Sequence, residues 1–199
     1  MNPQNEFKAD IPSTRRFVLA GGPGTGKSTL VSALAASGQV CYEECSRGLI
    51  KEQLAAGGRL VPWQDLLGFA LECSRRMCAQ ISDSAMHTHC FFDRGLPDLI
   101  GYLRSAGYRS PDAWAREARA YASTVFFAPP WREIYRTDAE RPQDFAEAEA
   151  LGTHVRQAYL ECGFTLVELV KGTVSDRVHQ VLSLLNLATA SAQSWETNT

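Results

Sequence analysis

The sequence lacks a hydrophobic run long enough to cross a membrane, since none approaches the roughly 20 apolar residues that a spanning helix needs. The segment from Met1 to Asp10 is polar and lacks the apolar core of a signal peptide. Neither sign of charge dominates, because 20 lysines and arginines stand against 22 acidic residues. The resulting net charge of −2 gives no general attraction to nucleic acid or to an anionic membrane. We therefore expect a cytoplasmic protein without a membrane span or a nucleic-acid partner.

None of the six cysteines belongs to a C-x-x-C pair, and most lie in apolar patterns where a free thiol acts as a small hydrophobic side chain. This usage indicates reduced thiols and gives no sign of a disulfide framework. The run His87-Thr88-His89-Cys90 has no second ligand cluster to accompany it. We interpret it as a loop that enters a strand and not as a metal site.

No internal repeat or interdomain linker divides the 199 residues. The hydrophobic fraction of 45% and the charged fraction of 21% are typical of a globular chain with a sizeable core. We expect a single domain over 13–187, with a flexible N-terminus at 1–12 and a flexible C-terminal tail at 188–199. The sequence gives no signal for an oligomeric state.

Short apolar runs alternate with helical patterns, which predicts an α/β domain built on a parallel sheet. Strands are expected near 15–20, 39–42, 90–93, 124–128 and 165–170. Helices are expected at about 27–36, 46–56, 64–82, 97–106, 112–122, 142–162 and 174–187. Gly163 is expected to end the sixth helix.

The last helix has the clearest start signal. Thr173 followed three residues later by Asp176 predicts a capping box. The buried face of this helix is expected to consist of Val174, Val178, Val181, Leu182 and Leu185.

The most specific motif is Gly21-Gly22-Pro23-Gly24-Thr25-Gly26-Lys27-Ser28, which matches the phosphate-binding pattern G-x-x-x-x-G-K-[ST]. It follows the first expected strand and precedes the first expected helix, as the motif requires. Backbone N–H groups of such a loop cradle a polyphosphate, while Lys27 neutralises charge and Ser28 supplies a hydroxyl to Mg²⁺. The helix that follows directs its positive dipole at the same anion. We predict that Gly21 to Thr29 bind a nucleoside triphosphate.

Asp93 and Arg94 follow directly after the third expected strand. A carboxylate at the end of a buried strand is costly unless it is paired or near a metal, and Mg²⁺ held with Ser28 is the natural partner beside a phosphate loop. Arg94 can hold a phosphate or acceptor oxygen in a bidentate way. The alternative is an Asp–Arg pair that caps a helix. We favour the functional interpretation, with Ser28 and Asp93 as metal ligands, and interpret Asp98 as a helix-start residue.

Glu44 follows the second expected strand. A carboxylate there can accept the proton of a hydroxyl that attacks the γ-phosphate. It can equally serve only to stabilise the N-terminus of the next helix. Both Glu44 and Asp93 therefore stand as candidates for the base.

The segment 129–145 contains Arg132, Arg136 and Arg141. Phosphoryl transfer uses mobile cations that close over the developing charge, so this segment is a candidate arginine lid. Because acidic residues balance these arginines, a solvated charged loop is the alternative. Trp63, between two expected helices, can stack on a flat ring, although a core position is the commoner role of such a tryptophan.

The chain resembles the small AAA-type P-loop ATPase and kinase-like proteins related to the nicotinamide-riboside kinase domain of NadR proteins. The residues that carry the resemblance lie in 15–186 and are Gly21–Ser28, Glu44–Arg47, Val61–Trp63, Asp93–Asp98 and 129–145. The resemblance implies a three-layer P-loop kinase-like fold with strand order 2-3-1-4-5. It also implies that Arg136 and Arg141 are lid arginines and that Glu44 is the base.

We therefore expect an Mg²⁺-dependent phosphotransferase that uses ATP, with GTP as a possible donor, and a small-molecule phosphate acceptor. The absence of an Asn-Lys-x-Asp guanine signature favours ATP. The residues expected to act in catalysis are Lys27, Glu44, Asp93, Arg94, Arg136 and Arg141. The alternative is a nucleotide-switched NTPase that binds a protein or lipid partner. An inactive nucleotide-binding scaffold is least favoured, because Lys27, Ser28 and Asp93 are all present.

Overall fold

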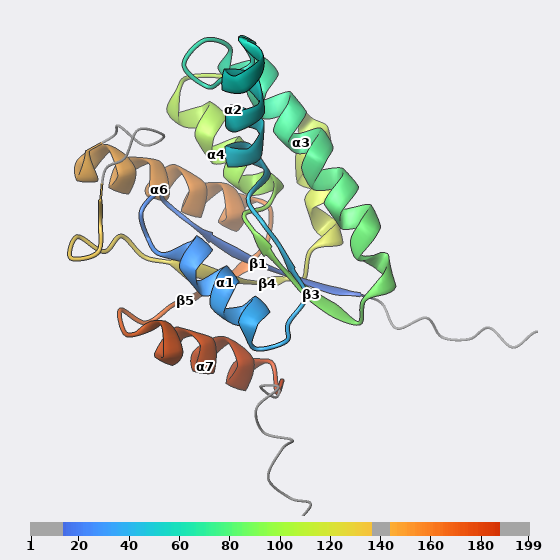
Figure 1. The fold of residues 1–199 in the computed structure, drawn as a ribbon, viewed down its shortest axis with the longest axis vertical. Helices are drawn as coiled ribbons and strands as arrows, with labels where there is room; N and C mark the ends of the chain where they lie inside the picture. The colour runs from blue at the N-terminus through green and yellow to red at the C-terminus, as the bar shows by residue number, and fades with distance from the viewer. Residues whose placement is uncertain (1–13, 137–143, 188–199) are drawn as a thin grey trace, which may run out of the picture.

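The computed structural model describes residues 14–136 and 144–187, which form an α/β domain around one parallel sheet (Figure 1). The strands are β1 (Arg15–Gly21), β2 (Cys41–Tyr42), β3 (His89–Asp93), β4 (Thr124–Ala128) and β5 (Thr165–Glu168). Their order in the sheet is β2-β3-β1-β4-β5, and every neighbouring pair is parallel. The predicted α/β fold and the strand order implied by the resemblance are both confirmed.

The helices alternate with these strands along the chain. They are α1 (Lys27–Ala36), α2 (Cys45–Ala56), α3 (Leu66–Asp83), η1 (Ser84–Met86), α4 (Leu96–Ser105), α5 (Asp112–Glu117), η2 (Ala118–Ala120), α6 (Phe145–Glu161) and α7 (Val174–Leu184). The single helix expected over 112–122 is wrong, because a 3₁₀ turn replaces its second half. Within the described ranges, no helix combines the length and the apolar character that a membrane crossing requires. The tails expected at 1–12 and 188–199 lie outside the described residues.

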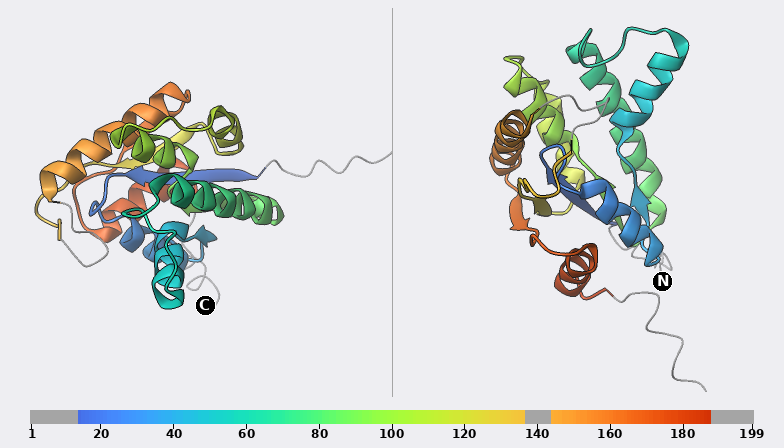
Figure 2. Two further views of the ribbon diagram at one scale, coloured as in Figure 1. Left: turned by 90° about the horizontal axis from the view of Figure 1, so that it is seen from above. Right: turned by 60° about the vertical axis from the view of Figure 1, so that its left-hand side comes forward.

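Alternating side chains of β1 separate the interior into two hydrophobic cores. Phe17 and Leu19 pack with residues of α1 and α7, whereas Val18 and Ala20 pack with residues of α3 through α6. This alternation follows from the period of two residues in a strand. Figure 2 shows helices on both sides of the sheet, so the domain has three layers. All four residues are nearly inaccessible to solvent.

Side-chain caps define where the last two helices begin. Asp144 and Glu147 form a capping box at α6, and Thr173 and Asp176 form the expected one at α7. Gly163 follows α6 with a φ of +86°, which confirms it as the predicted stop.

The expected buried face of α7 is only partly correct. Val181 and Leu182 are buried, but Val174 is 39% exposed. The buried residue in the first turn is instead Arg177. An apolar period identifies the core-facing stripe of a helix but gives no sign of a buried charge.

Helices α4 and α6 pack closely at Gly101. A Cβ atom at this position would lie 2.6 Å from the Cα of Val155. That distance is far shorter than a van der Waals contact, and the atom it meets is backbone, which cannot move aside alone. Gly101 therefore sets the separation between these two helices.

We predict that Gly101→Ala destabilises the protein by about 1–3 kcal/mol through overpacking. Gly48 in α2 is the matched control, because a Cβ there would have nothing within 4 Å. Gly48→Ala is expected to stabilise the protein by about 0.5–1 kcal/mol through helix propensity. Urea unfolding of both variants measures the difference. Equal effects of the two substitutions would contradict the close packing of α4 on α6.

Candidate active site

The phosphate-binding loop joins the end of β1 to the start of α1. Gly26 is the N-cap of α1 with a φ of +79°, and among the described residues no side chain caps this helix start. The first backbone N–H groups of α1 are therefore available to an anion. Thr25 closes the loop on itself, because its hydroxyl donates to the carbonyl of Gly22 over 3.0 Å.

Two glycines of this loop have no room for a side chain. A Cβ at Gly21 would lie 2.4 Å from the carbonyl oxygen of Ala128 in β4, and Gly21 has a φ of +134°. A Cβ at Gly22 would lie 2.7 Å from the carbonyl oxygen of Ala148 in α6. The start of the loop is thus fixed against β4 and α6, which explains why these positions are glycine.

Lys27 is buried beneath the loop and bonds to its backbone. Its Nζ donates to the carbonyls of Gly21 and Gly22 over 2.9 and 2.6 Å, and to the hydroxyl of Thr25 over 3.2 Å. Burial, with the neighbouring charge of Arg94, lowers the pKa of Lys27 to about 7. A negatively charged ligand in the loop would favour the protonated amine.

Ser28 and Asp93 meet at the carboxyl ends of adjacent strands. Asp93 ends β3, which pairs with β1 in the register Leu19 to Asp93. The Ser28 hydroxyl donates to Asp93 Oδ2 over 2.8 Å. Asp93 Oδ1 is buried, and the described residues offer it no hydrogen-bond partner. Burial and then the nearby charge of Glu44 raise the pKa of the Asp93 carboxyl.

Arg94 connects three parts of the site. Its Nε donates to Glu44 Oε1 over 2.8 Å, and its Nη1 donates to Asp98 Oδ1 over 3.1 Å and to the carbonyl of Gly21 over 3.2 Å. The residue is 7% exposed and has a φ of +77°, a conformation that costs energy for any residue except glycine. The left-handed conformation of Arg94 turns the chain sharply after β3.

Glu44 is the residue immediately before α2 and is ionised. Burial opposes its charge, but Arg94, a hydrogen bond from Ser46 and then Lys27 outweigh burial and lower its pKa to about 2. Arg47 forms a second ion pair with Glu44 at 3.5 Å. The stability from these pairs is present above the ordinary pKa of 4.5 and is lost as the pH falls toward 2.

Asp98 serves at the start of α4, as expected, and also contacts Arg94 and α6. It does accept a hydrogen bond from the backbone of Gly95 at the start of α4. Its side chain is also completely buried and accepts from Tyr159 of α6 over 2.6 Å. Asp98 therefore forms an ion pair with Arg94 and links α4 to α6 through Tyr159.

Arg177 is a site residue that the sequence analysis missed. It is 3% exposed, and its Nη1 donates to the carbonyl of Thr25 over 2.9 Å, while its Nε donates to the carbonyl of Val170 over 3.0 Å. The guanidinium also lies 5.5 Å from the ring of Trp131. Arg177 therefore supports the loop from the side of α7. Arg177 stands on the apolar stripe of α7, but the period of a helix does not distinguish a buried arginine from an exposed one.

The candidate arginine lid is described only in part. Arg132 lies over the ring of Phe145 at 4.3 Å, which ties the segment after β4 to the start of α6. Arg136 is exposed and donates to the backbone carbonyls of Glu133 and Tyr135. Arg141 lies outside the described residues. Arg136 borders the main cavity, and Arg132 is not among the residues that line it.

A cavity of about 1140 Å³ brings most of these residues together. It extends from the phosphate-binding loop past Glu44 and Arg94 to a region between α2, α3 and α4, and its other end reaches Trp131 and the start of α7. In Figure 1 the helices α2, α3 and α4 stand together above the sheet. The residues that line it include Gly24, Lys27, Ser28, Glu44, Arg94, Trp63, Phe69, Tyr102, Thr173 and Arg177.

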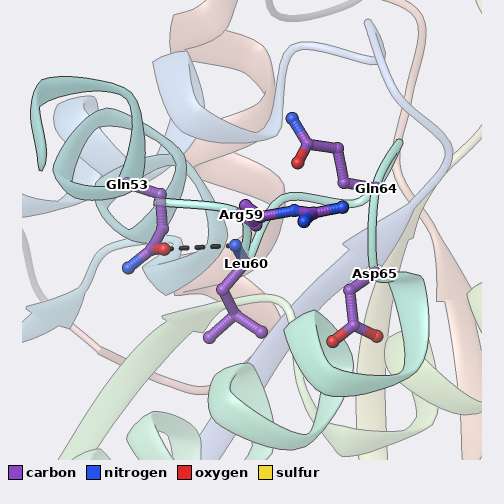
Figure 3. A pocket seen from close by; sticks show the side chains of 5 residues that line it. All are labelled: Gln53, Arg59, Leu60, Gln64 and Asp65. Carbon is purple, nitrogen blue, oxygen red and sulfur yellow. Dashed lines mark hydrogen bonds between the residues drawn. The ribbon is translucent and has the colours of Figure 1, made fainter. Parts of the chain in front are cut away.

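A smaller cavity of about 420 Å³ lies at the turn between α2 and α3, and Figure 3 shows the side chains that line it. The turn is fixed because Gln53 Oε1 accepts a hydrogen bond from the backbone of Leu60 over 3.1 Å, and Asp65 caps α3. The same turn carries Trp63, which is 57% exposed and borders the larger cavity. A core position for Trp63 is therefore wrong.

Comparison with known proteins agrees with this arrangement. A family profile described as an AAA domain matches residues 16–177. No curated protein matches the chain. A NadR protein in complex with NR superposes with a TM-score of 0.67 at 17% identity, covering 90% of this chain and 54% of that one. This chain thus spans about half of the NadR chain.

Two kinases of similar length also match. Deoxyadenosine kinase from M. mycoides with bound dATP gives a TM-score of 0.56 at 13% identity, covering 86% of this chain and 99% of the kinase. Thymidylate kinase from Candida albicans gives a TM-score of 0.58 at 15% identity, covering 87% of this chain and 91% of the kinase. At these identities the likeness shows the fold. Since the family profile spans most of the chain, this protein belongs to the AAA-domain family and has the fold of the P-loop kinases.

Proposed function

We propose that this protein is an Mg²⁺-dependent phosphotransferase that moves the γ-phosphoryl group of a nucleoside triphosphate to a hydroxyl of a small molecule. One observation carries the proposal: the phosphate-binding loop and Glu44 border one continuous cavity that extends between α2, α3 and α4. Donor and acceptor can therefore meet within a preformed space, as phosphoryl transfer requires.

The donor phosphates are assigned to Gly21 through Thr29. Backbone N–H groups at the start of α1, which no side chain of the described residues caps, supply positive potential together with the buried amine of Lys27. The nucleobase of the donor is assigned to the end of the cavity bordered by Trp131, Gly172 and Thr173. We favour ATP as the donor, with GTP as the alternative, because the chain has no Asn-Lys-x-Asp sequence.

Ser28 and Asp93 fit a magnesium site. Asp93 has one buried carboxylate oxygen without a partner among the described residues, and its other oxygen is bonded to the Ser28 hydroxyl. Oxygen ligands of this kind suit Mg²⁺, which keeps several water molecules and binds through a few protein oxygens. When bound, the ion neutralises charge on the triphosphate.

Glu44 is the group that we assign to the acceptor hydroxyl. It borders the cavity, and it is ionised because Arg94 holds it in that state. With a pKa of about 2 it is a weak base, so its main task is to accept a hydrogen bond from the hydroxyl and orient it. A loose phosphoryl-transfer transition state needs little proton removal before the bond to phosphorus forms. Asp93 is the alternative base, although a metal-binding role for it competes with proton transfer.

Arg94 and Arg136 receive different roles. The guanidinium of Arg94 is already bonded to Glu44, Asp98 and the carbonyl of Gly21, so we assign it to positioning Glu44 against the loop. Arg136 is exposed at the cavity and is assigned to the transferring phosphoryl group. Arg141 is proposed as a second lid arginine on the resemblance alone.

A nucleotide-switched NTPase is the second candidate. The segment after β4 favours it, because Trp131 contacts Arg177, which in turn holds the phosphate-binding loop. A change in the loop on hydrolysis could therefore reach this segment. Phosphate release that needs no acceptor would favour the switch over the kinase.

The first test concerns Lys27. Mg²⁺ with ATP at a hundredfold excess over the dissociation constant should stabilise the wild-type protein by about 2.7 kcal/mol, and Lys27→Ala should remove most of this effect. Lys51 is an exposed lysine of α2, so Lys51→Ala is the control and should keep the full stabilisation by nucleotide. Thermal unfolding with and without nucleotide measures the change. Equal stabilisation of both variants would contradict a nucleotide in this loop.

The second test concerns Glu44. Glu44→Gln should lower acceptor-dependent turnover on the order of 10²-fold, because it removes the oxygen that orients the hydroxyl. The adjacent Glu43 is exposed, so Glu43→Gln is the matched control and should leave turnover within about twofold. Steady-state kinetics with labelled nucleotide measures both. If the two variants have the same turnover, the role given to Glu44 is wrong.

The third test concerns Arg136. Arg136→Ala should lower turnover on the order of 10³-fold and change nucleotide affinity only slightly, since a lid arginine acts on the transition state. Arg109→Ala is the control, because Arg109 is an exposed residue that does not border the cavity. Unchanged turnover in Arg136→Ala would remove this residue from the mechanism.

A further inference from the structure

The cavity contains a region that is well suited to a particular class of acceptor. We call this the acceptor region, and the argument about it rests on the proposed function. It lies between α2, α3 and α4 and is lined by Ile50, Leu66, Phe69, Ala70, Leu99 and Tyr102. Ile50, Phe69 and Leu99 are each less than 10% exposed, so these walls are preformed.

The walls are apolar and partly aromatic. Phe69 and Tyr102 come from α3 and α4, and Trp63 borders the same cavity from the turn between α2 and α3. The faces of these rings bind flat or apolar bodies. A ligand that enters this region must therefore leave most of its hydration outside.

The charged side chains at the inner end of the acceptor region balance one another. Arg94 pairs with Glu44 at 2.8 Å and with Asp98 at 3.1 Å, and Arg47 pairs with Glu44 at 3.5 Å. Two cations thus stand against two carboxylates. Glu147 of α6 adds a further carboxylate to the cavity lining, which also includes His154. Among the described residues, the charges at this inner end therefore balance, and Arg136, which borders the cavity outside these pairs, is the arginine assigned to the transferring phosphoryl group.

The two arginines of α3 do not supply a cation to the acceptor region either. Arg75 pairs with Glu72 at 2.7 Å, and Arg76 pairs with Glu52 at 2.6 Å. Neither arginine borders the cavity. A phosphate monoester or a carboxylate bound in the acceptor region would therefore lose hydration without gaining a cation, which costs several kcal/mol.

We infer that the phosphate acceptor is an uncharged alcohol with a flat, largely apolar body, and that compounds already carrying a phosphate or carboxylate are excluded. In the reaction the acceptor oxygen bonds to the γ-phosphorus as the bond between this phosphorus and the β–γ bridging oxygen breaks. The hydroxyl proton, which is hydrogen-bonded to Glu44 while the bond to phosphorus forms, is released to solvent, and the products are a phosphate monoester and a nucleoside diphosphate. The apolar walls hold the body of the alcohol, while Glu44 orients its hydroxyl.

The test uses acceptors in charge-matched pairs. Full-length protein with Mg²⁺ and γ-labelled ATP or GTP is given thymidine against thymidine 5′-monophosphate, deoxyadenosine against its 5′-monophosphate, and benzyl alcohol against 4-(hydroxymethyl)benzoate. We expect kcat/KM to be about tenfold or more higher for the uncharged member of any pair that is phosphorylated. Transfer that is equal or better with the anionic member overturns this inference and leaves the proposed function standing. Phosphate release with no transfer to any compound overturns the proposed function and the inference with it.

A variant locates the acceptor. Trp63→Ala should raise the KM for the uncharged acceptor about tenfold and leave the dissociation constant of the nucleotide unchanged, because Trp63 borders the cavity three residues before Leu66, which lines the acceptor region. Trp63 is 57% exposed, so this substitution leaves the folded core intact. Leu67→Ala is the control, since Leu67 is 38% exposed on α3 and lies outside the cavity lining. An unchanged KM in Trp63→Ala would overturn the placement of the acceptor between these helices.

Discussion

The site depends on the buried guanidinium of Arg94. This one side chain bonds to the phosphate-binding loop through Gly21, to the start of α2 through Glu44, and to α4 through Asp98. A buried charge is costly unless each of its donors has a partner, so the three elements are fixed relative to one another. The positive φ of Arg94 gives the turn that brings its side chain there. The separation between the donor and acceptor ends of the cavity follows from this arrangement.

The chemistry proposed for the cavity follows from how charge is distributed along it. At the loop, the start of α1 and the amine of Lys27 supply positive potential, and one oxygen of Asp93 has no hydrogen-bond partner among the described residues. Beyond Glu44 the ion pairs balance and the walls become apolar. One end therefore suits a polyphosphate with Mg²⁺, and the other suits an uncharged hydroxyl compound.

Local patterns were enough to predict the strands, the phosphate-binding loop and the Ser28–Asp93 contact. Each depends on residues that are adjacent in sequence or that end neighbouring parallel strands. Two features were not predictable in this way. Arg177 is buried where α7 packs against the phosphate-binding loop, and the carbonyl of Thr25, 152 positions away, accepts its hydrogen bond. Trp63 is exposed on the turn between α2 and α3, where it borders the cavity. Both depend on how distant elements pack, which periodicity does not record.

A double-mutant cycle between Glu44→Gln and Arg94→Lys, measured as the free energy of unfolding, tests most directly whether Arg94 joins the two sides of the site. Lysine keeps the charge but loses the fork that bonds to several partners. We expect a coupling free energy of about 1–3 kcal/mol, because the two side chains share one buried ion pair. Effects that add to within about 0.3–0.5 kcal/mol would contradict it, since independent sites behave in that way.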